Sequence, residues 1–128
     1  MVRDFDLKRV PRSFRYAARG IWHVLRNEQN LRIHVAATAV AVLAGLLLEI
    51  SGPEFAIILL AVGLVLTAEV LNTVIEDFLD ILHPQHHASV RRIKDALAGA
   101  VLLAAIVAIG VGALIFGPRL LAALGLAP

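Results

Sequence analysis

Three long stretches of this sequence carry no charged side chain, and they restrict what the chain can fold into. Residues 33–48, 55–68 and 96–118 contain no Asp, Glu, Lys or Arg. With its flanking residues, each stretch approaches the roughly 20 residues that a helix needs to cross a bilayer core. The whole chain is 59% hydrophobic, which exceeds the roughly 45–50% that is usual for soluble domains. We therefore predict an all-α integral membrane protein.

The 128 residues fit a single domain with an amino-terminal arm and three membrane spans. We place the arm at residues 1–30 and the transmembrane helices at residues 31–50, 55–82 and 95–118. In the arm, apolar residues recur at helical spacing and arginines gather on another face. The apolar face comprises Phe14, Ala18, Ile21, Trp22 and Leu25, and the basic face comprises Arg12, Arg15, Arg19 and Arg26. An amphipathic helix of this kind typically lies at a membrane surface, although packing against the protein itself would produce the same pattern.

The distribution of basic residues sets the expected orientation. Residues 1–32 carry eight of the 12 Lys and Arg residues, and the loop at 83–94 carries three more. The first turn between spans carries Glu49 and Glu54 instead. Because short loops rich in Lys and Arg stay on the cytoplasmic side, we expect a cytoplasmic amino terminus and 83–94 loop, with the carboxyl terminus outside. Arg119 runs against this expectation.

One helical face of the second span is polar. Glu69, Asn72, Thr73, Glu76 and Asp80 are spaced at i, i+3, i+4, i+7 and i+11, which places them on one side of a helix. Ionisable groups inside a span are costly and usually mark function. An exposed helix end would explain Asp80, but Glu69 stands between apolar neighbours and needs another explanation.

Other polar residues are expected at the same membrane boundary. Glu28 precedes the first span, and Lys94 and Asp95 precede the third. Glu28 and Glu76 could share a hard cation, which prefers oxygen ligands and often binds phosphates as well. Lys94 could meet a phosphate as a point charge. Asp95 has a second available role as the N-cap of the third helix.

The third span carries a stripe of small residues at every fourth position. Its members are Ala96, Ala100, Ala104, Ala108 and Gly112. Small residues let helix backbones approach closely in a bilayer, so this span should pack against a helix of the same chain or of another subunit.

Several other classes of function lack support in the sequence. Aromatic residues make up 5% of the chain, too few for a base-stacking surface, so no nucleic-acid partner is expected. The phosphate-binding motifs GxxxxGK[ST] and GxGxxG do not occur. His83, His86 and His87 lack a fourth ligand for a zinc site, and the chain has no cysteine to provide one.

Three runs of residues resemble the prokaryotic diacylglycerol kinase family, which includes undecaprenol kinases. They are SFRYAARGIWHVLRNEQNLRIH (Ser13–His34), AEVLNTVIEDFLD (Ala68–Asp80) and KDALAGAVLL (Lys94–Leu103). The resemblance extends over residues 10–118 with the same order of motifs and three spans. It implies a homotrimeric kinase of the bacterial cytoplasmic membrane, with its active site on the cytoplasmic side, that transfers the γ-phosphate of MgATP to a lipid hydroxyl.

The resemblance also implies roles for individual residues. Glu69 would be the general base, Glu28 and Glu76 would hold Mg²⁺, and Asn72 and Asp95 would act beside the catalytic carboxylate. Gln85 and His86 stand where the family often has Glu-Tyr. The full set of implied nucleotide contacts is Arg9, Tyr16, Glu28, Glu76, Gln85, His86, His87, Lys94 and Asp95.

The choice of lipid is expected to follow the same resemblance. The stretch from Asn30 to His34 and the SFRYA opening look more like the undecaprenol kinase branch, with diacylglycerol as the second choice. The residues alone also leave open a small transporter in which Glu69 carries a proton or cation.

Overall fold

Four helices account for almost all of the structure. The computed structural model describes residues 9–84 and 87–126. Its helices are α1 (Arg9–Asn27), α2 (Gln29–Leu47), α3 (Gly52–Leu82) and α4 (Ala88–Ala123), and the described residues include no strand. The last three helices are long and apolar enough to cross a membrane. The prediction of an all-helical membrane protein with a helical arm and three spans is confirmed.

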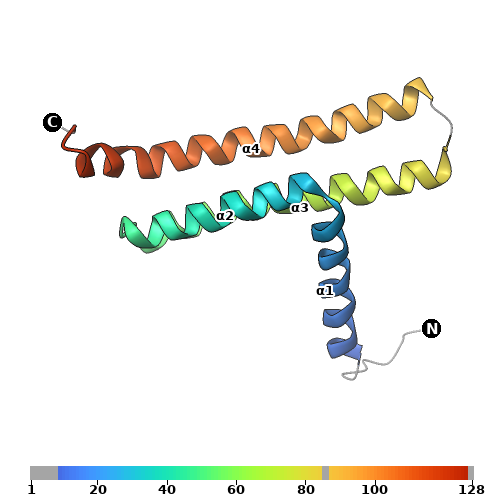
Figure 1. Ribbon diagram of the computed structural model, residues 1–128, viewed down its shortest axis with the longest axis horizontal. Coiled ribbons are helices and arrows are strands. Elements are labelled where there is room, and N and C mark those ends of the chain that lie inside the picture. The colour runs from blue at the N-terminus through green and yellow to red at the C-terminus, as the bar shows by residue number, and fades with distance from the viewer. Residues whose placement is uncertain (1–8, 85–86, 127–128) are drawn as a thin grey trace.

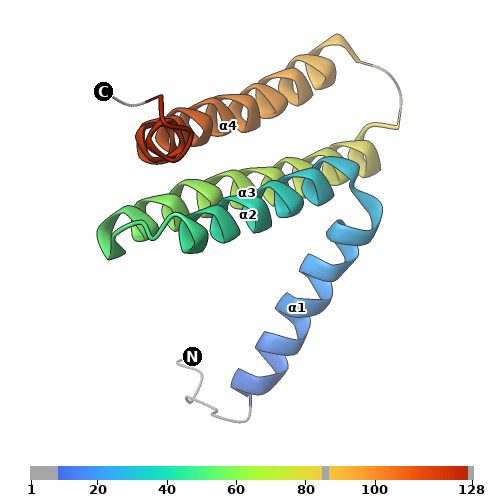
Figure 2. The same cartoon turned by 60° about the vertical axis from the view of Figure 1, so that its left-hand side comes forward.

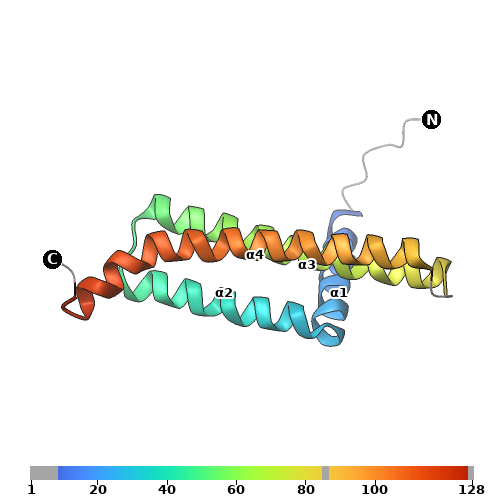
Figure 3. The ribbon, with the colours of Figure 1, turned by 90° about the horizontal axis from the view of Figure 1, so that it is seen from above.

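The three long helices form a bundle from which the arm departs. α3 packs against both α2 and α4 (Figure 1, Figure 3). α1 turns away from the bundle and does not continue along it (Figure 2). Only a thin core is buried, and most large apolar side chains, such as Leu60 and Leu114, are exposed. The buried apolar residues are Val24, Leu31, Ile58, Val65, Val101, Ala104 and Ile115. Apolar side chains that point outward along helices suit a surrounding of lipid or of other subunits.

A single residue separates the arm from the first span. Glu28 has extended backbone angles, φ −99° and ψ 121°, and stands at the N-cap of α2. The helical path therefore breaks at Glu28, and α1 changes direction there. Val24, the buried residue of α1, lies one turn before the break. The break places the Glu28 side chain at the junction of the arm and the bundle.

The turn between α2 and α3 is tightly packed. A Cβ atom on Gly45 would lie 3.0 Å from Ile50 Cδ1 and 3.1 Å from Phe55 Cε2, so a side chain there would displace its neighbours. Ser51 and Glu54 form a capping box in which the Ser51 backbone N–H donates to the Glu54 carboxylate at 2.8 Å. The box satisfies donors at the start of α3 that have no partner within the helix.

α4 corrects two sequence predictions. The helix begins at Ala88 with His87 as its N-cap, so the predicted N-cap role of Asp95 is wrong. Residues 88–94 include Ser89 and three basic side chains, but they include no glycine or proline, and Ala, Arg and Lys are good helix formers. The edge of the apolar stretch is therefore not the edge of the helix. α4 also continues through Pro118 to Ala123, so the helix extends past both ends of the span predicted at residues 95–118.

The small-residue stripe of α4 divides between two environments. Ala104 is buried and Ala108 and Gly112 are partly buried, whereas Ala96 and Ala100 are exposed. The half of the stripe nearer the carboxyl terminus thus packs inside the chain. The other half is exposed in the part of the chain that the structure describes.

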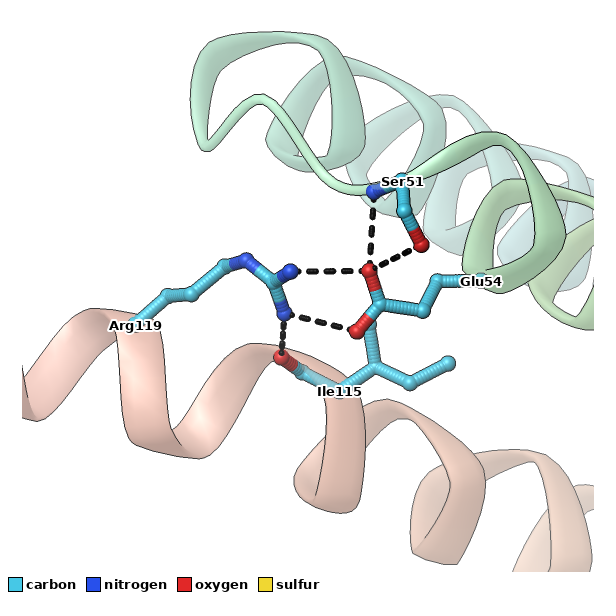
Figure 4. Close-up of polar contacts among 4 residues, drawn as sticks. All are labelled: Ser51, Glu54, Ile115 and Arg119. Carbon is cyan, nitrogen blue, oxygen red and sulfur yellow. Dashed lines mark hydrogen bonds and ion pairs between the residues drawn. The ribbon is translucent and has the colours of Figure 1, made fainter.

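An ion pair joins α3 and α4 at the end remote from their connecting loop (Figure 4). Arg119 binds the Glu54 carboxylate in a two-pronged contact, with nitrogen–oxygen distances of 2.9 and 2.8 Å. Arg119 also donates to the Ile115 carbonyl at 2.9 Å, and the Ser51 hydroxyl donates to Glu54 at 2.6 Å. Paired Arg–carboxylate contacts of this type are stronger than single ones. The contact gives Arg119 a structural reason to lie outside the two basic segments of the sequence.

We expect Arg119→Lys to lower the thermal unfolding midpoint, because an ammonium group cannot make the two parallel contacts of a guanidinium. Arg119→Gln should lower it further. The measurement is helix loss on heating in detergent, followed by circular dichroism. In a double-mutant cycle with Glu54→Gln, the two losses should be smaller together than their sum. Additive losses would show that the pair does not couple α3 to α4.

Candidate functional site

The most buried polar side chain of the described residues is a carboxylate in the middle of α3. Glu69 is 2% exposed, and Asn72 and Thr73 on the same face are 8% and 6% exposed. The Thr73 hydroxyl donates to the Glu69 backbone carbonyl at 3.1 Å, so its hydrogen bond is local. Glu69 and Asn72 have no such local explanation. A buried charge is expensive unless it has partners, so their surroundings decide what they can do.

The partners of Glu69 come from α2 and from both sides of the break at Glu28. The side chain of Asn30 is within hydrogen-bonding reach of the Glu69 carboxylate, and the His34 ring lies near enough for its charge to act on Glu69. Glu28 and Glu76 lie near enough for their charges to act on Glu69. Glu28 therefore lies in the same region as Glu69, although it stands 41 positions before it in the chain.

Asn72 contributes an unused hydrogen-bond acceptor to this region. Its Oδ1 atom is the one buried side-chain nitrogen or oxygen atom in the described part of the chain that has no hydrogen-bond partner. Leaving such an atom unpaired costs about 1–3 kcal/mol. Buried polar groups of this kind in native proteins call for an explanation, and a bound group is one.

The oxygen atoms in the region of Glu69 are of the kind that a small divalent cation prefers. Mg²⁺ is usually held by one or two carboxylates together with water and substrate phosphates, and a full protein cage is not needed. Glu28 and Glu76 supply two carboxylates, and the free Oδ1 of Asn72 supplies a neutral oxygen. No group of three or more metal-binding side chains occurs among the described residues, so only a metal that also uses phosphate or water oxygens fits.

Lys94 lies at the end of the bundle where α3 and α4 meet their loop. Its ammonium donates to Asp80 Oδ1 at 2.5 Å. Beside this pair is a hollow of about 540 Å³ that is lined in part by His83, His87 and Arg91. The predicted nucleotide contacts Lys94 and His87 therefore share one hollow with further basic side chains. A hollow of this character attracts anions.

The structure does not bring every predicted residue to these groups. Asp95 is exposed, and within residues 9–84 and 87–126 no hydrogen bond or ion pair joins it to the carboxylates of α3. Tyr16 is exposed on α1, where the guanidinium groups of Arg15 and Arg19 lie 5.9 and 6.0 Å from its ring centre. Arg9 is the first residue of α1. Its side chain, Gln85 and His86 lie outside the described residues.

Asn30 and His34 are site residues that sequence reasoning missed. The sequence analysis used them as a mark of one branch of a family, without a position next to Glu69. They are four apart on α2, on the side that also carries the buried Leu31, and four-residue spacing on one helix face was the available signal. The sequence pattern did not show how α2 is aligned with α3, because that alignment depends on the turn between the two helices.

The fold and the site define a class of protein before any comparison is made. A bundle of helices long enough to cross a membrane carries a buried carboxylate, Glu69, and at one end a hollow lined in part by Lys94, Arg91 and histidines. That arrangement suits a membrane enzyme that works on a charged substrate where the bilayer meets water.

Comparison with known proteins identifies the family. The model of the prokaryotic diacylglycerol kinase family matches residues 15–116. The undecaprenol kinase of Bacillus subtilis (strain 168) is 41% identical over 115 residues, which cover 90% of this chain and 94% of that protein. A diacylglycerol kinase of Synechocystis sp. is 38% identical over 85% of this chain and 63% of its own length. The diacylglycerol kinase of Escherichia coli (strain K12) is 30% identical, over 79% and 83% respectively. The chain belongs to the prokaryotic diacylglycerol kinase family, and it is an ATP-dependent lipid kinase.

We expect Asn72→Leu to raise the thermal unfolding midpoint while it removes kinase turnover. The change replaces a buried amide whose oxygen is unpaired with an apolar group of similar size, so it removes a cost of about 1–3 kcal/mol. It also removes the acceptor that we assign to the site. The measurements are thermal unfolding in detergent and lipid phosphorylation.

Thr73→Val provides the matched control for this substitution. It also replaces a buried polar side chain by an apolar one on the same turn of α3, but the Thr73 hydroxyl already has a partner. We expect it to retain turnover. Loss of stability in Asn72→Leu, or retention of full turnover, would contradict a ligand-directed role for Asn72.

Proposed function

We propose that this protein transfers the γ-phosphate of MgATP to the hydroxyl group of undecaprenol and forms undecaprenyl phosphate. The observation that carries the proposal is the likeness to the Bacillus subtilis undecaprenol kinase, because that likeness spans 90% of this chain and 94% of the relative. Diacylglycerol is the second candidate acceptor. It is supported by the 38% identity to the Synechocystis diacylglycerol kinase.

Glu69 is our candidate for the general base that accepts the proton of the lipid hydroxyl. A base must come within hydrogen-bonding reach of the proton it removes. Glu69 lies inside the bundle, on the face of α3 that leads to the hollow at Lys94. Because Glu69 is buried, a lipid hydroxyl must enter between the helices to reach it, while ATP remains on the water side. Asn30 holds the carboxylate in one orientation by its amide.

We assign Mg²⁺ to Glu28 and Glu76, with Asn72 Oδ1 as a third nearby oxygen. When bound, the ion neutralises phosphate charge, which is the main requirement of phosphoryl transfer. Lys94 supplies a further positive charge for the phosphates from α4. Glu28 at the break before α2 and Glu76 on α3 belong to different helices. The packing of α2 on α3 therefore keeps the two carboxylates together.

The remaining nucleotide contacts are proposed from the family resemblance. They comprise Arg9 and Tyr16 on α1, the loop residues Gln85, His86 and His87, and Asp95 beside Lys94. α1 turns away from the bundle next to Glu28 (Figure 2). A surface helix at that junction can cover a nucleotide bound at the boundary.

We further propose a homotrimer in the bacterial cytoplasmic membrane with its active site on the cytoplasmic side. The exposed half of the α4 stripe, at Ala96 and Ala100, offers a close-packing surface for a helix of a neighbouring subunit. The basic α1 and the loop with Arg91, Arg92 and Lys94 favour the cytoplasmic side.

The test of the proposed function is phosphate transfer from γ-labelled ATP in mixed micelles that contain undecaprenol and diacylglycerol side by side. Label is expected in undecaprenyl phosphate, and Glu69→Gln should reduce it to background while the protein remains folded. Label mainly in phosphatidic acid would replace undecaprenol by diacylglycerol as the acceptor. An absence of label in both lipids with folded protein and Mg²⁺ would overturn the proposal and favour transport of a proton or cation by Glu69.

We expect Glu76→Gln to raise the Mg²⁺ concentration that gives half-maximal turnover. The substitution keeps the size of the side chain and one oxygen but removes a negative charge from the proposed ligands. Turnover is measured over a Mg²⁺ titration at constant ATP. The control is Asp77→Asn, which removes an exposed carboxylate at the next position on α3. It should leave the Mg²⁺ concentration for half-maximal turnover unchanged. Equal titrations for Glu76→Gln and the wild type would place the metal elsewhere.

A further inference from the structure

The ion pair between Lys94 and Asp80 links the two helices that lead into the cytoplasmic loop. The Lys94 ammonium and Asp80 Oδ1 are 2.5 Å apart. The Lys94 side chain is 29% exposed and that of Asp80 is 64% exposed, so solvent reaches the carboxylate more readily than the ammonium. Glu76 and Asp77, which precede Asp80 on α3, also act on the charge of Lys94. Lys94 is thus held by acidic side chains of α3.

The hollow beside this pair has the opposite character. It measures about 540 Å³, within the ~300–1,000 Å³ of small-molecule sites. Arg91, Lys94, His83 and His87 contribute to its lining, and Asp80 is the one carboxylate among the described residues that line it. A polyphosphate in the hollow would meet several cationic or chargeable groups and a single negative charge. That negative charge is the carboxylate of Asp80, which pairs with Lys94 in the structure.

We propose that Lys94 exchanges Asp80 for a phosphate oxygen when a nucleotide binds, so that Asp80 sets the affinity for the nucleotide. The proposal rests on the proposed function, because it takes a nucleoside triphosphate as the ligand of the hollow. A lysine ammonium is a compact charge on a flexible stem, so it can turn from the carboxylate to a phosphate. The carboxylate competes for the ammonium and repels the phosphates, and both effects weaken nucleotide binding.

The test measures the affinity of a non-hydrolysable ATP analogue with Mg²⁺ for the purified full-length protein in detergent, by calorimetry. Asp80→Asn keeps the size of the side chain but removes its charge, and it should tighten binding by about three- to fivefold, the upper range of an exposed ion pair. Asp77→Asn removes an equal charge from an exposed side chain of the same helix that acts on Lys94 through its field, without the direct contact that Asp80 makes. Because exposed charges are screened by salt, it should change the affinity by about twofold at most.

A second arm tests whether the effect of Asp80 passes through Lys94. In a Lys94→Met background, Asp80→Asn should tighten binding by clearly less than it does in the wild type, since the competition for the ammonium is gone. Weaker binding in Asp80→Asn, or a change no larger than that of Asp77→Asn, would overturn the exchange. An equal effect of Asp80→Asn with and without Lys94 would overturn it as well.

The failure of this inference differs from the failure of the proposed function. A wild-type protein that labels lipid and binds the analogue, but whose affinity is unmoved by Asp80→Asn, retains its function and loses only the exchange. A wild-type protein that neither binds the analogue nor labels lipid loses the proposed function, and the exchange with it.

Discussion

The burial of Glu69 inside a helix bundle is the constraint on which the rest of this structure depends. A carboxylate that is 2% exposed is stable in an apolar surrounding only if other groups compensate its charge or hydrogen-bond to it. The chain supplies them from outside α3, with Asn30 and His34 on α2. For Asn30 and His34 to reach Glu69, α2 must begin at the level of Glu69 along α3. The break in the helical path at Glu28 sets that beginning. The same break directs α1 away from the bundle, so the arm and the site have one structural origin.

Phosphoryl transfer at a membrane boundary needs groups with different preferences to meet within a short distance. The acceptor hydroxyl belongs to a lipid and the donor to water, and a three-span chain has little protein with which to enclose both. α3 resolves this by running past the start of α2 toward the loop (Figure 1). Its face therefore passes from apolar residues through Glu69 and Asn72 to the exposed Asp80. One helix thus carries the change from membrane to water, and its neighbours contribute at successive depths.

The sequence predicted the parts of this structure that depend on local pattern. Charge-free stretches located the three spans, and spacing on one helix face selected Glu69, Asn72 and Glu76 together. The sequence did not predict the contacts that depend on how the helices align with one another. The start of α4 at Ala88 was not predicted, because a membrane helix can continue through charged residues beyond the end of its charge-free stretch. Asn30 and His34 were not recognised as neighbours of Glu69, and Arg119 had no assigned partner, because each contact crosses between helices whose relative register no local pattern records.

The two ion pairs between α3 and α4 lie far apart along the helices. Asp80 follows Glu54 by 26 positions on α3, and Arg119 follows Lys94 by 25 positions on α4. At a rise of about 1.5 Å per residue the pairs stand some 39 Å apart, which is more than the ~30 Å of a hydrocarbon core. While Lys94 remains on Asp80, both pairs oppose a shift of α4 along α3, because such a shift would lengthen the two contacts at once. A change in bilayer thickness is then met more readily by tilting the two helices together than by sliding one along the other.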